Sequence, residues 1–515
     1  MRATRFVVGP GAPARRRGPA LRLPVILGLG LGLGLGLGAC KKSDDKGGAA
    51  PPAPAVGSKE TRPSPCRPAG ETRGALTWFE NDFTRASACA AERKVPLVID
   101  MWAPWCHTCL SMQSYVMTDP SFAPLADRFV FVALDTDRED SAAALARFPV
   151  SAWPTFYVVS PDGATVEGRF VGSTDVAGFR DFLATAERTF LDGAQLADDD
   201  PLARVRAGDR AMVAAGTLES GTEARKVLLD EARHAYQEAL AAAPADWPRR
   251  PDVLVSLVGA LLRDGDAAAC ADLATAHVAE TGKAAPAADF MAYALGCAAD
   301  LAKQDPAKAR ALRELAVTRL EALLADPGSQ LSIDDRSDAM INLRDTYDAL
   351  DRHADAVRTA EAQRQMLDDA AAKAPSPAVA MTFNYHRADV YAYLGRHDEL
   401  VPALEKSAAD LPEEYDPPYR LAGLLEDAGR HDDALPWAEK ALALAYGPRK
   451  ARVARLVATI QHERGDRAAE RAAREQVVAI YAGLPAGQQA PEALELARTE
   501  LAAMDAPPTS PPATR

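Results

Sequence analysis

The feature that most constrains the fold is a repeat in the second half of the chain. The tetrapeptide Gly-Arg-His-Asp begins at Gly395 and again at Gly429, an offset of 34 residues. Ala434 and Ala441 follow Gly429 at a spacing where the two helices of a hairpin must approach closely. Amphipathic helical patterning extends over residues 203–504. These observations predict a stack of helix pairs, because each pair can bury its apolar face only against its neighbours.

The 34-residue period resembles that of the tetratricopeptide repeats. The resemblance covers about 300 residues and implies seven or eight helix pairs in an all-α superhelix at 203–504. Such a superhelix has a concave groove, and we expect a protein or an extended peptide to bind there. The alternative is that the array only spaces or dimerises the domain before it. His353, His397 and His431 fall at equivalent inter-helix turns and are interpreted as turn residues, not metal ligands.

Length and composition restrict the remaining possibilities. A chain of 515 residues exceeds what one hydrophobic core usually organises, so two or three domains are expected. Aromatic residues make up only 6% of the chain, which favours helix pairs in its Ala- and Leu-rich second half. The formal net charge of -13 argues against nucleic acid as a partner, because phosphate binding requires clustered Lys and Arg.

The N-terminus has the pattern of a secretory signal. Six Arg precede an apolar Leu-Gly stretch that ends in Leu-Gly-Ala-Cys at Cys40. This ending resembles a bacterial lipobox, which implies a lipoprotein signal peptide at 1–39 and a lipid anchor on Cys40. The protein is then expected in the bacterial cell envelope, facing the periplasm and attached to a membrane. The alternative is a single transmembrane helix, although the apolar stretch is shorter than the about 20 residues needed to span a bilayer.

Two segments have no apolar period. Residues 40–75 are rich in Pro, Ala, Gly and charge and are predicted to be a flexible tether. Residues 506–515 contain several prolines and are predicted to be a disordered tail.

Residues 76–191 show a different pattern, in which short β-rich runs alternate with amphipathic stretches. The predicted elements are helix 79–93, strand 95–102, helix 106–117, strand 129–135, helix 141–148, strands 155–159 and 165–171, and a closing helix from residue 176. The alternation predicts an α/β domain ahead of the helical array.

A Cys-X-X-Cys motif stands where the second of these elements ends and the next helix begins. Cys106 at a helix N-terminus would have its thiolate stabilised by unpaired backbone amides and the helix dipole. Cys109 lies one turn on, within disulfide reach. The alternative is half of a zinc site, but the sequence offers no second cysteine pair or nearby histidine cluster. The motif therefore predicts thiol-disulfide chemistry without a metal or a cofactor.

The stretch from Asp100 to Cys109, with Trp153-Pro154-Thr155 and Val171-Gly172, is similar to the thioredoxin family over roughly 115 residues. The resemblance implies that Cys106 attacks, that Cys109 resolves, and that a buried Asp100 accepts a proton from Cys109. It also implies a cis-proline at Pro154 facing the disulfide. The residues expected along the substrate groove are Trp105, His107, Trp153, Pro154 and Gly172.

The resemblance implies a thiol-disulfide oxidoreductase acting on protein disulfides or dithiols. His-Thr between the cysteines, Leu110 after them and Ala133 in a strand depart from the cytosolic pattern, which leaves the redox potential and the direction of exchange open. Residues 118–122 and 135–137 look closer to the envelope reductase branch, which includes the C-terminal domain of the transmembrane disulfide reductase. The leading hypothesis is an enzyme whose repeats recruit a protein partner. The alternative is a repeat-based scaffold lipoprotein with a thioredoxin-like docking module.

Setting Cys40 aside leaves an even number of six cysteines, which suits an oxidising compartment. Two structural disulfides are predicted, Cys66 with Cys89 and Cys270 with Cys297. The latter two are 27 residues apart and would lie on adjacent helices. The alternative is four buried free thiols.

Overall fold

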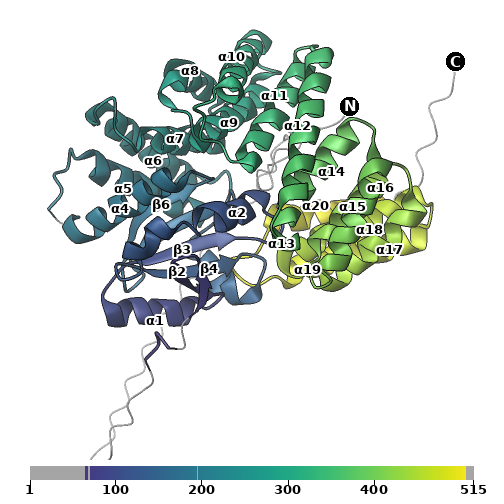
Figure 1. The fold of residues 1–515 in the computed structure, drawn as a ribbon, viewed down its shortest axis with the longest axis horizontal. Coiled ribbons are helices and arrows are strands. Elements are labelled where there is room, and N and C mark those ends of the chain that lie inside the picture. The colour runs from purple at the N-terminus through teal and green to yellow at the C-terminus, as the bar shows by residue number, and fades with distance from the viewer. Residues whose placement is uncertain (1–63, 68–69, 194, 506–515) are drawn as a thin grey trace, which may run out of the picture. The chain divides into compact units, whose positions relative to one another are not determined.

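The computed structural model describes residues 64–67, 70–193 and 195–505 (Figure 1). Apart from Ser64, these residues belong to one compact unit. The predicted signal peptide at 1–39, the lipidation site Cys40 and the predicted tail at 506–515 lie outside the described residues. Within the described ranges, no helix has both the length and the apolar character needed to cross a membrane.

The N-terminal part is an α/β domain around one mixed sheet. Its six strands are β1 (Glu71–Arg73), β2 (Leu76–Glu80), β3 (Leu97–Trp102), β4 (Val130–Asp135), β5 (Thr155–Val159) and β6 (Val166–Val171). The strand order is β1-β2-β4-β3-β5-β6. The strand β3 is central, parallel to β4 and antiparallel to β5, and its carboxyl end leads directly into the cysteine motif.

Helices cover both faces of this sheet. They are α1 (Phe83–Arg93), α2 (His107–Ser111), α3 (Ala142–Leu145) and α4 (Val176–Asp192), with a π-helical turn at Met112–Val116 and 3-10 turns at Pro120–Leu125 and Glu139–Ser141. Side chains of β3 alternate between the two cores: Val98 packs with Met112 below α2, whereas Ile99 packs on the α1 side. Asp100 follows two residues after Val98 and therefore faces α2.

Local structure differs from the sequence expectation at three places. Residues 71–73, expected in the tether, form β1 and pair with β2. The helix expected from residue 79 begins at Phe83, because Trp78 and Phe79 fill opposite cores as strand residues and Asp82 caps the helix through the backbone N–H of Arg85. The helix expected at 106–117 changes from α to π geometry at Met112, a deviation often found at functional sites.

The rest of the described chain is helical. It contains sixteen α-helices: α5 (Pro201–Gly216), α6 (Glu223–Ala242), α7 (Arg250–Asp264), α8 (Ala267–His277), α9 (Ala285–Leu301), α10 (Pro306–Ala325), α11 (Ile333–Ala349), α12 (His353–Lys373), α13 (Pro377–Met381), α14 (Asn384–Tyr393), α15 (His397–Asp410), α16 (Asp416–Asp427), α17 (His431–Leu444), α18 (Gly447–Glu463), α19 (Arg467–Gly483) and α20 (Pro491–Ala503). Consecutive helices pack on one another as pairs, such as α11 with α12 and α18 with α19. The predicted fold class, an α/β domain followed by an all-α array, is confirmed.

The turns between helices have a recurrent geometry. Gly395, Gly429 and Gly465 have φ values of 69°, 74° and 74°, in the left-handed region that favours glycine after a helix. Ala434 and Ala441 on α17 are fully buried, as close helix packing requires. His353, His397 and His431 are the first residues of α12, α15 and α17, immediately after such turns.

Two disulfides lie outside the cysteine motif. One joins Cys66, ahead of β1, to Cys89 on α1. The other joins Cys270 on α8 to Cys297 on α9. The first attaches the chain before the sheet to the α/β domain, and the second crosslinks neighbouring repeat helices.

Candidate active site

Cys106 and Cys109 form a disulfide at the start of α2. Cys106 is the N-cap residue, and its Sγ accepts the backbone N–H of Cys109 at 3.0 Å. This amide and the positive end of the helix dipole would stabilise a thiolate on Cys106 once the disulfide is reduced. Both cysteines are nonetheless buried, with exposed fractions of 4% for Cys106 and 1% for Cys109.

Asp100 lies on β3 below the helix that carries both cysteines. Its Oδ2 accepts a hydrogen bond from Gln113 Nε2 at 3.0 Å, and no described residue donates one to Oδ1. Burial raises the pKa of Asp100 to about 6, although the bond from Gln113 opposes that rise. Near neutral pH the ionised carboxylate can therefore accept a proton, as the thioredoxin resemblance requires of this residue.

Asp100→Asn is expected to stabilise the fold at neutral pH and to slow exchange. Between pH 4 and 6 the Asp100 side chain loses its proton in the unfolded chain but keeps it in the folded protein. Rising pH therefore lowers the free energy of unfolding of the wild type, whereas that of the variant does not change by this route. Above pH 6 the variant should be more stable by up to about 3 kcal/mol, measured by urea unfolding. The difference should shrink as the pH falls and vanish near pH 3, below the ordinary pKa of an aspartate.

The same substitution should slow resolution by Cys109 about a hundredfold, because the thiol loses its proton acceptor. Stopped-flow measurement of mixed-disulfide decay checks this. Equal decay rates in variant and wild type at pH 7 would show that Asp100 takes no part in resolution.

Four of the five predicted groove residues, Trp105, Trp153, Pro154 and Gly172, are brought together, whereas His107 turns toward the helical array. The Trp153–Pro154 peptide bond is cis. The Pro154 carbonyl accepts the Gly172 N–H at 3.0 Å, and the rings of Trp105 and Trp153 meet edge to face with centroids 5.1 Å apart. Trp105 and Trp153 also pack against Cys106 and Cys109, so this surface borders the disulfide.

Helices of the array cover that surface. The Arg420 guanidinium donates to the Trp105 carbonyl at 3.3 Å, and the Arg449 guanidinium lies 4.8 Å from the centre of the Trp105 ring. A Cβ added at Gly172, where φ is +90°, would lie 2.4 Å from Asp289 Oδ2 on α9. Residues of α9, α16 and α18 therefore cover Gly172 and Trp105, and Trp105 in turn packs against Cys106.

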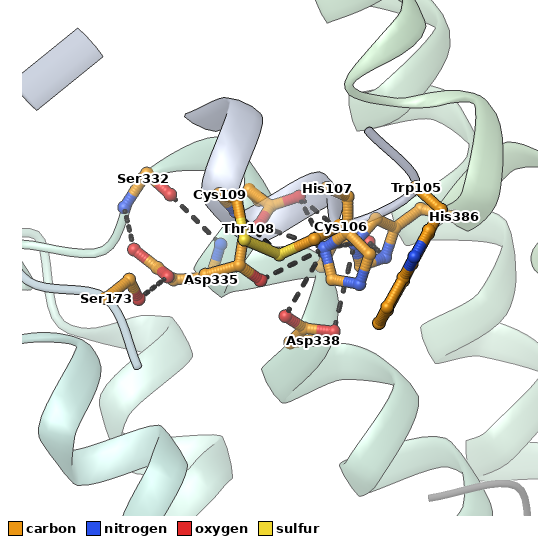
Figure 2. Close-up of polar contacts among 12 residues, drawn as sticks. Trp105, Cys106, His107, Thr108, Cys109, Ser173, Ser332, Asp335, Asp338 and His386 are labelled. Carbon is orange, nitrogen blue, oxygen red and sulfur yellow. Dashed lines mark hydrogen bonds and ion pairs between the residues drawn. A yellow bond between two sulfur atoms is a disulfide. The ribbon is translucent and has the colours of Figure 1, made fainter. Parts of the chain in front are cut away.

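His107 points into the helical array (Figure 2). Its Nδ1 lies 3.0 Å from Asp334 Oδ1 on α11 and 2.9 Å from His386 Nε2 on α14. Its ring stacks on that of Tyr385, with centroids 4.8 Å apart. Burial alone would lower the pKa of His107, but the Asp334 and Asp338 carboxylates raise that pKa to about 9. As a cation between the two cysteines, His107 would favour the Cys106 thiolate.

The loop after β4 is a second point of contact. Asp137 accepts hydrogen bonds from Trp105 Nε1 at 2.7 Å and from the Tyr415 hydroxyl at 3.3 Å, and Asp135 accepts one from the Tyr446 hydroxyl at 2.5 Å. Burial is the main cause that raises the pKa of Asp135 to about 7 and that of Asp137 to about 6. The loop therefore links the tryptophan of the motif to α16 and to the start of α18.

Sequence reasoning missed every residue that the array contributes. Asp334 and His386 lie 227 and 279 residues after His107, and no motif connects them. The histidines that the repeat pattern singled out, His353, His397 and His431, are not part of this site. Asp334 and His386 lie in the first turns of α11 and α14, where polar residues are common, so no sequence signal distinguished them.

Comparison with known proteins agrees with the geometry of the α/β domain. A family model described as "Thioredoxin-like" matches residues 78–161. Residues 78–161 form a thioredoxin-like domain. The model spans β2 to the end of β5, including the cysteine motif and the cis-proline.

Two curated relatives are thioredoxin-like proteins. The chain is 34% identical over 93 residues to the chloroplastic thioredoxin-like protein CITRX of Solanum tuberosum, which is 18% of this chain and 50% of that protein. It is 39% identical over 72 residues to CITRX of Oryza sativa subsp. indica, covering 14% and 35% of the two chains. The chain thus spans half or less of the length of these relatives.

A solved structure is similar to the larger part of the chain. It is a tetratricopeptide repeat protein from Parabacteroides merdae, with a TM-score of 0.35 and 13% sequence identity, covering 58% of this chain and 100% of that one.

Proposed function

We propose that this protein is a thiol-disulfide oxidoreductase that exchanges disulfides with protein substrates through Cys106 and Cys109. The observation that carries the proposal is the position of Cys106 Sγ, which accepts the Cys109 amide N–H at the start of α2. Asp100 below the same helix and the cis Trp153–Pro154 bond complete the arrangement, and Trp153 packs against both cysteines. A purely structural thioredoxin-like domain has no need of these groups together.

In the reducing direction, the Cys106 thiolate attacks one sulfur of a substrate disulfide. The substrate S–S bond breaks, one substrate thiolate leaves, and a mixed disulfide with Cys106 forms. Cys109 then gives its proton to Asp100 and attacks Cys106 Sγ, which releases the second substrate thiolate. The Cys106–Cys109 disulfide that remains is reduced again by a dithiol donor, and the oxidising direction reverses each step.

The decisive experiment is a redox titration of the purified protein. The Cys106–Cys109 pair is equilibrated in glutathione buffers, trapped by alkylation and quantified by mass. In a second assay the protein is mixed with insulin as a protein disulfide, with dithiothreitol as the dithiol donor that reduces the pair again. A single two-electron transition and catalytic reduction of insulin are expected. A reduced pair that transfers no electrons to insulin or to an unfolded disulfide protein would favour the scaffold alternative.

We also propose that Cys40 carries a lipid and holds the protein at a bacterial envelope membrane, facing the periplasm. The six described cysteines occur in three disulfides, which suits an oxidising compartment. Cys40→Ser should lose fatty-acid labelling and leave the membrane fraction. Unlabelled wild-type protein would contradict the anchor.

The array is proposed to recruit a protein partner and so control access to the active site. Arg420 on α16 and Arg449 on α18 contact Trp105, and Asp334 on α11 contacts His107. A partner that bound these helices would compete with their contacts to the thioredoxin-like domain. Partner binding would thereby expose Cys106 to a substrate.

A further inference from the structure

Four potential metal ligands converge from three helices of this chain. They are His107 on α2, Asp334 and Asp338 on α11, and His386 on α14, with one ligand atom of each lying within 4.8 Å of the others. Figure 2 shows Asp338 and His386 directed at His107, next to the Cys106–Cys109 disulfide. The cluster therefore joins the two domains at the redox motif.

The geometry of the three closest ligand atoms fits one face of a coordination polyhedron. His107 Nδ1, His386 Nε2 and Asp334 Oδ1 are separated by 2.9, 3.0 and 3.1 Å. Ligands on adjacent corners of an octahedron lie about 3.0 Å apart when the metal-ligand bonds are about 2.1 Å. Two histidines and one carboxylate on such a face are an established ligand set for divalent transition metals.

Asp338 supplies a fourth oxygen ligand close to this face. Its carboxylate oxygens lie 3.9 Å from His107 Nδ1 and 3.8 Å from His386 Nε2. The Asp338 side chain is 37% exposed, so it can turn toward an ion at the cost of a small movement. The site would be reached from the solvent on this side.

Hydrogen bonds from neighbouring side chains orient the buried ligand His386. His386 and Asp334 are fully buried side chains. Nδ1 of His386 contacts Ser337 Oγ at 2.7 Å, and Gln363 Nε2 donates to the same oxygen at 2.9 Å. The Ser337 contact directs Nε2 of His386 at the other ligand atoms. In metal sites, a hydrogen bond to the other ring nitrogen orients a ligating histidine in the same way.

The charges at the cluster also suit a divalent cation. Asp334 and Asp338 bring two carboxylates to the two ring nitrogens. The neighbouring cation is Arg420, whose guanidinium is paired with Asp416 at 2.9 Å and lies over the Tyr385 ring. A divalent ion bound by neutral imidazoles would balance both carboxylate charges. It would also replace the proton that His107 Nδ1 and His386 Nε2, 2.9 Å apart, must otherwise share.

We propose that His107, Asp334, Asp338 and His386 bind one divalent first-row transition metal ion of the Zn²⁺ class. Imidazole ligands disfavour Mg²⁺ and Ca²⁺, which prefer all-oxygen sites. Because the ligands come from both domains, the bound ion would fasten α11 and α14 to α2. The site does not depend on the proposed exchange activity, since binding involves no redox step.

Zn²⁺ alone is the probe in the test. The full chain is prepared oxidised, with its three disulfides intact, and with Cys40→Ser so that no thiol can bind zinc. Equilibrium dialysis at pH 7.5 should give one tight Zn²⁺ per chain. A large excess of Mg²⁺ or Ca²⁺ should not displace it.

His386→Gln and Asp334→Asn should each weaken Zn²⁺ binding at least about a hundredfold. The matched control is His397→Gln, since His397 Nε2 also contacts a carboxylate, Asp427 Oδ2 at 2.7 Å, but has no further ligands. That control should bind as the wild type does. If a buried variant fails to fold by circular dichroism, Asp338→Asn provides the test, with an expected loss of about tenfold or more.

Two results would overturn the site. One is wild-type binding no tighter than that of the folded ligand variants. The other is a Zn²⁺ stoichiometry that stays at one when His386 and Asp334 are both replaced. Either result would identify the cluster as a proton-sharing contact between the domains. Insulin reduction by the wild type without added metal is the separate readout of the proposed function.

Discussion

Cys106→Ser is expected to lower the rate constant for disulfide exchange at least about a thousandfold, whereas Cys109→Ser should stop the reaction after its first step. Cys106 Sγ is the sulfur that accepts the amide hydrogen bond at the helix start, so it is the sulfur best stabilised as a thiolate. Cys109 is the more deeply buried of the two and can act only within the protein. The Cys109→Ser protein should therefore accumulate a mixed disulfide.

Non-reducing gels of cells that express each variant provide the measurement. Adducts sensitive to dithiothreitol should appear with Cys109→Ser and be absent with Cys106→Ser, and mass spectrometry of the adducts would identify the substrates. Adducts with Cys106→Ser alone would reverse the assigned roles.

A double variant, Cys270→Ser with Cys297→Ser, serves as the control. It removes a disulfide between α8 and α9 that is remote from the motif in the chain. It should lower stability by about 3 kcal/mol and leave the exchange chemistry of the remaining cysteines intact. Loss of adducts in that background would mean that folding, not chemistry, limits the assay.

Gly447→Ala is expected to expose the active site. Gly447 begins α18 with φ of +52°, and a Cβ there would lie 1.8 Å from the backbone oxygen of Asp137. The methyl group must push α18 away from the loop that holds Trp105 through Asp137. If this weakens the contact by about 1.4 kcal/mol, the open population and the rate of Cys106–Cys109 reduction should both rise about tenfold.

Gly465→Ala isolates the effect of the clash. Gly465 also has a left-handed φ, of +74°, but a Cβ there would meet nothing within 4 Å. Both substitutions should cost about 1 kcal/mol of stability from backbone strain. Only Gly447→Ala should accelerate reduction by tris(2-carboxyethyl)phosphine, followed by alkylation of the released thiols. Equal rates in the two variants would show that α18 does not limit access to the disulfide.

The thioredoxin-like domain could be predicted from local patterns. The cysteine motif follows a strand of alternating core residues, and side chains of β3 do divide between two cores. The same patterns fail at Phe79, which is predicted to begin a helix but lies with Trp78 in β2. Their strand conformation depends on pairing with β1 and β4, and this pairing is not visible in a short window.

The array shows a similar division. Left-handed turns at Gly395, Gly429 and Gly465 follow from the residues at those positions, because a helix that ends in this conformation favours glycine. The 34-residue period does not show which helix faces remain uncovered after neighbouring helices have paired. It therefore does not show which faces contact another domain. The faces that contact the other domain depend on the curvature of the array, which is the sum of many small rotations between helices.

The sequence by itself determined the two fold classes, the position of the cysteine pair, and the turns that separate the repeats, because each depends on residues close together in the chain. Only the tertiary structure decided that Asp334 and His386 stand beside His107, and that α16 and α18 cover Trp105. These contacts join residues that are between 227 positions apart, for His107 and Asp334, and 344 positions apart, for Trp105 and Arg449. Their physical cause is the packing of the helical array, with its sixteen described helices, against the sheet domain. Small changes in the angles between successive helices add up along the array and decide which side chains reach that domain.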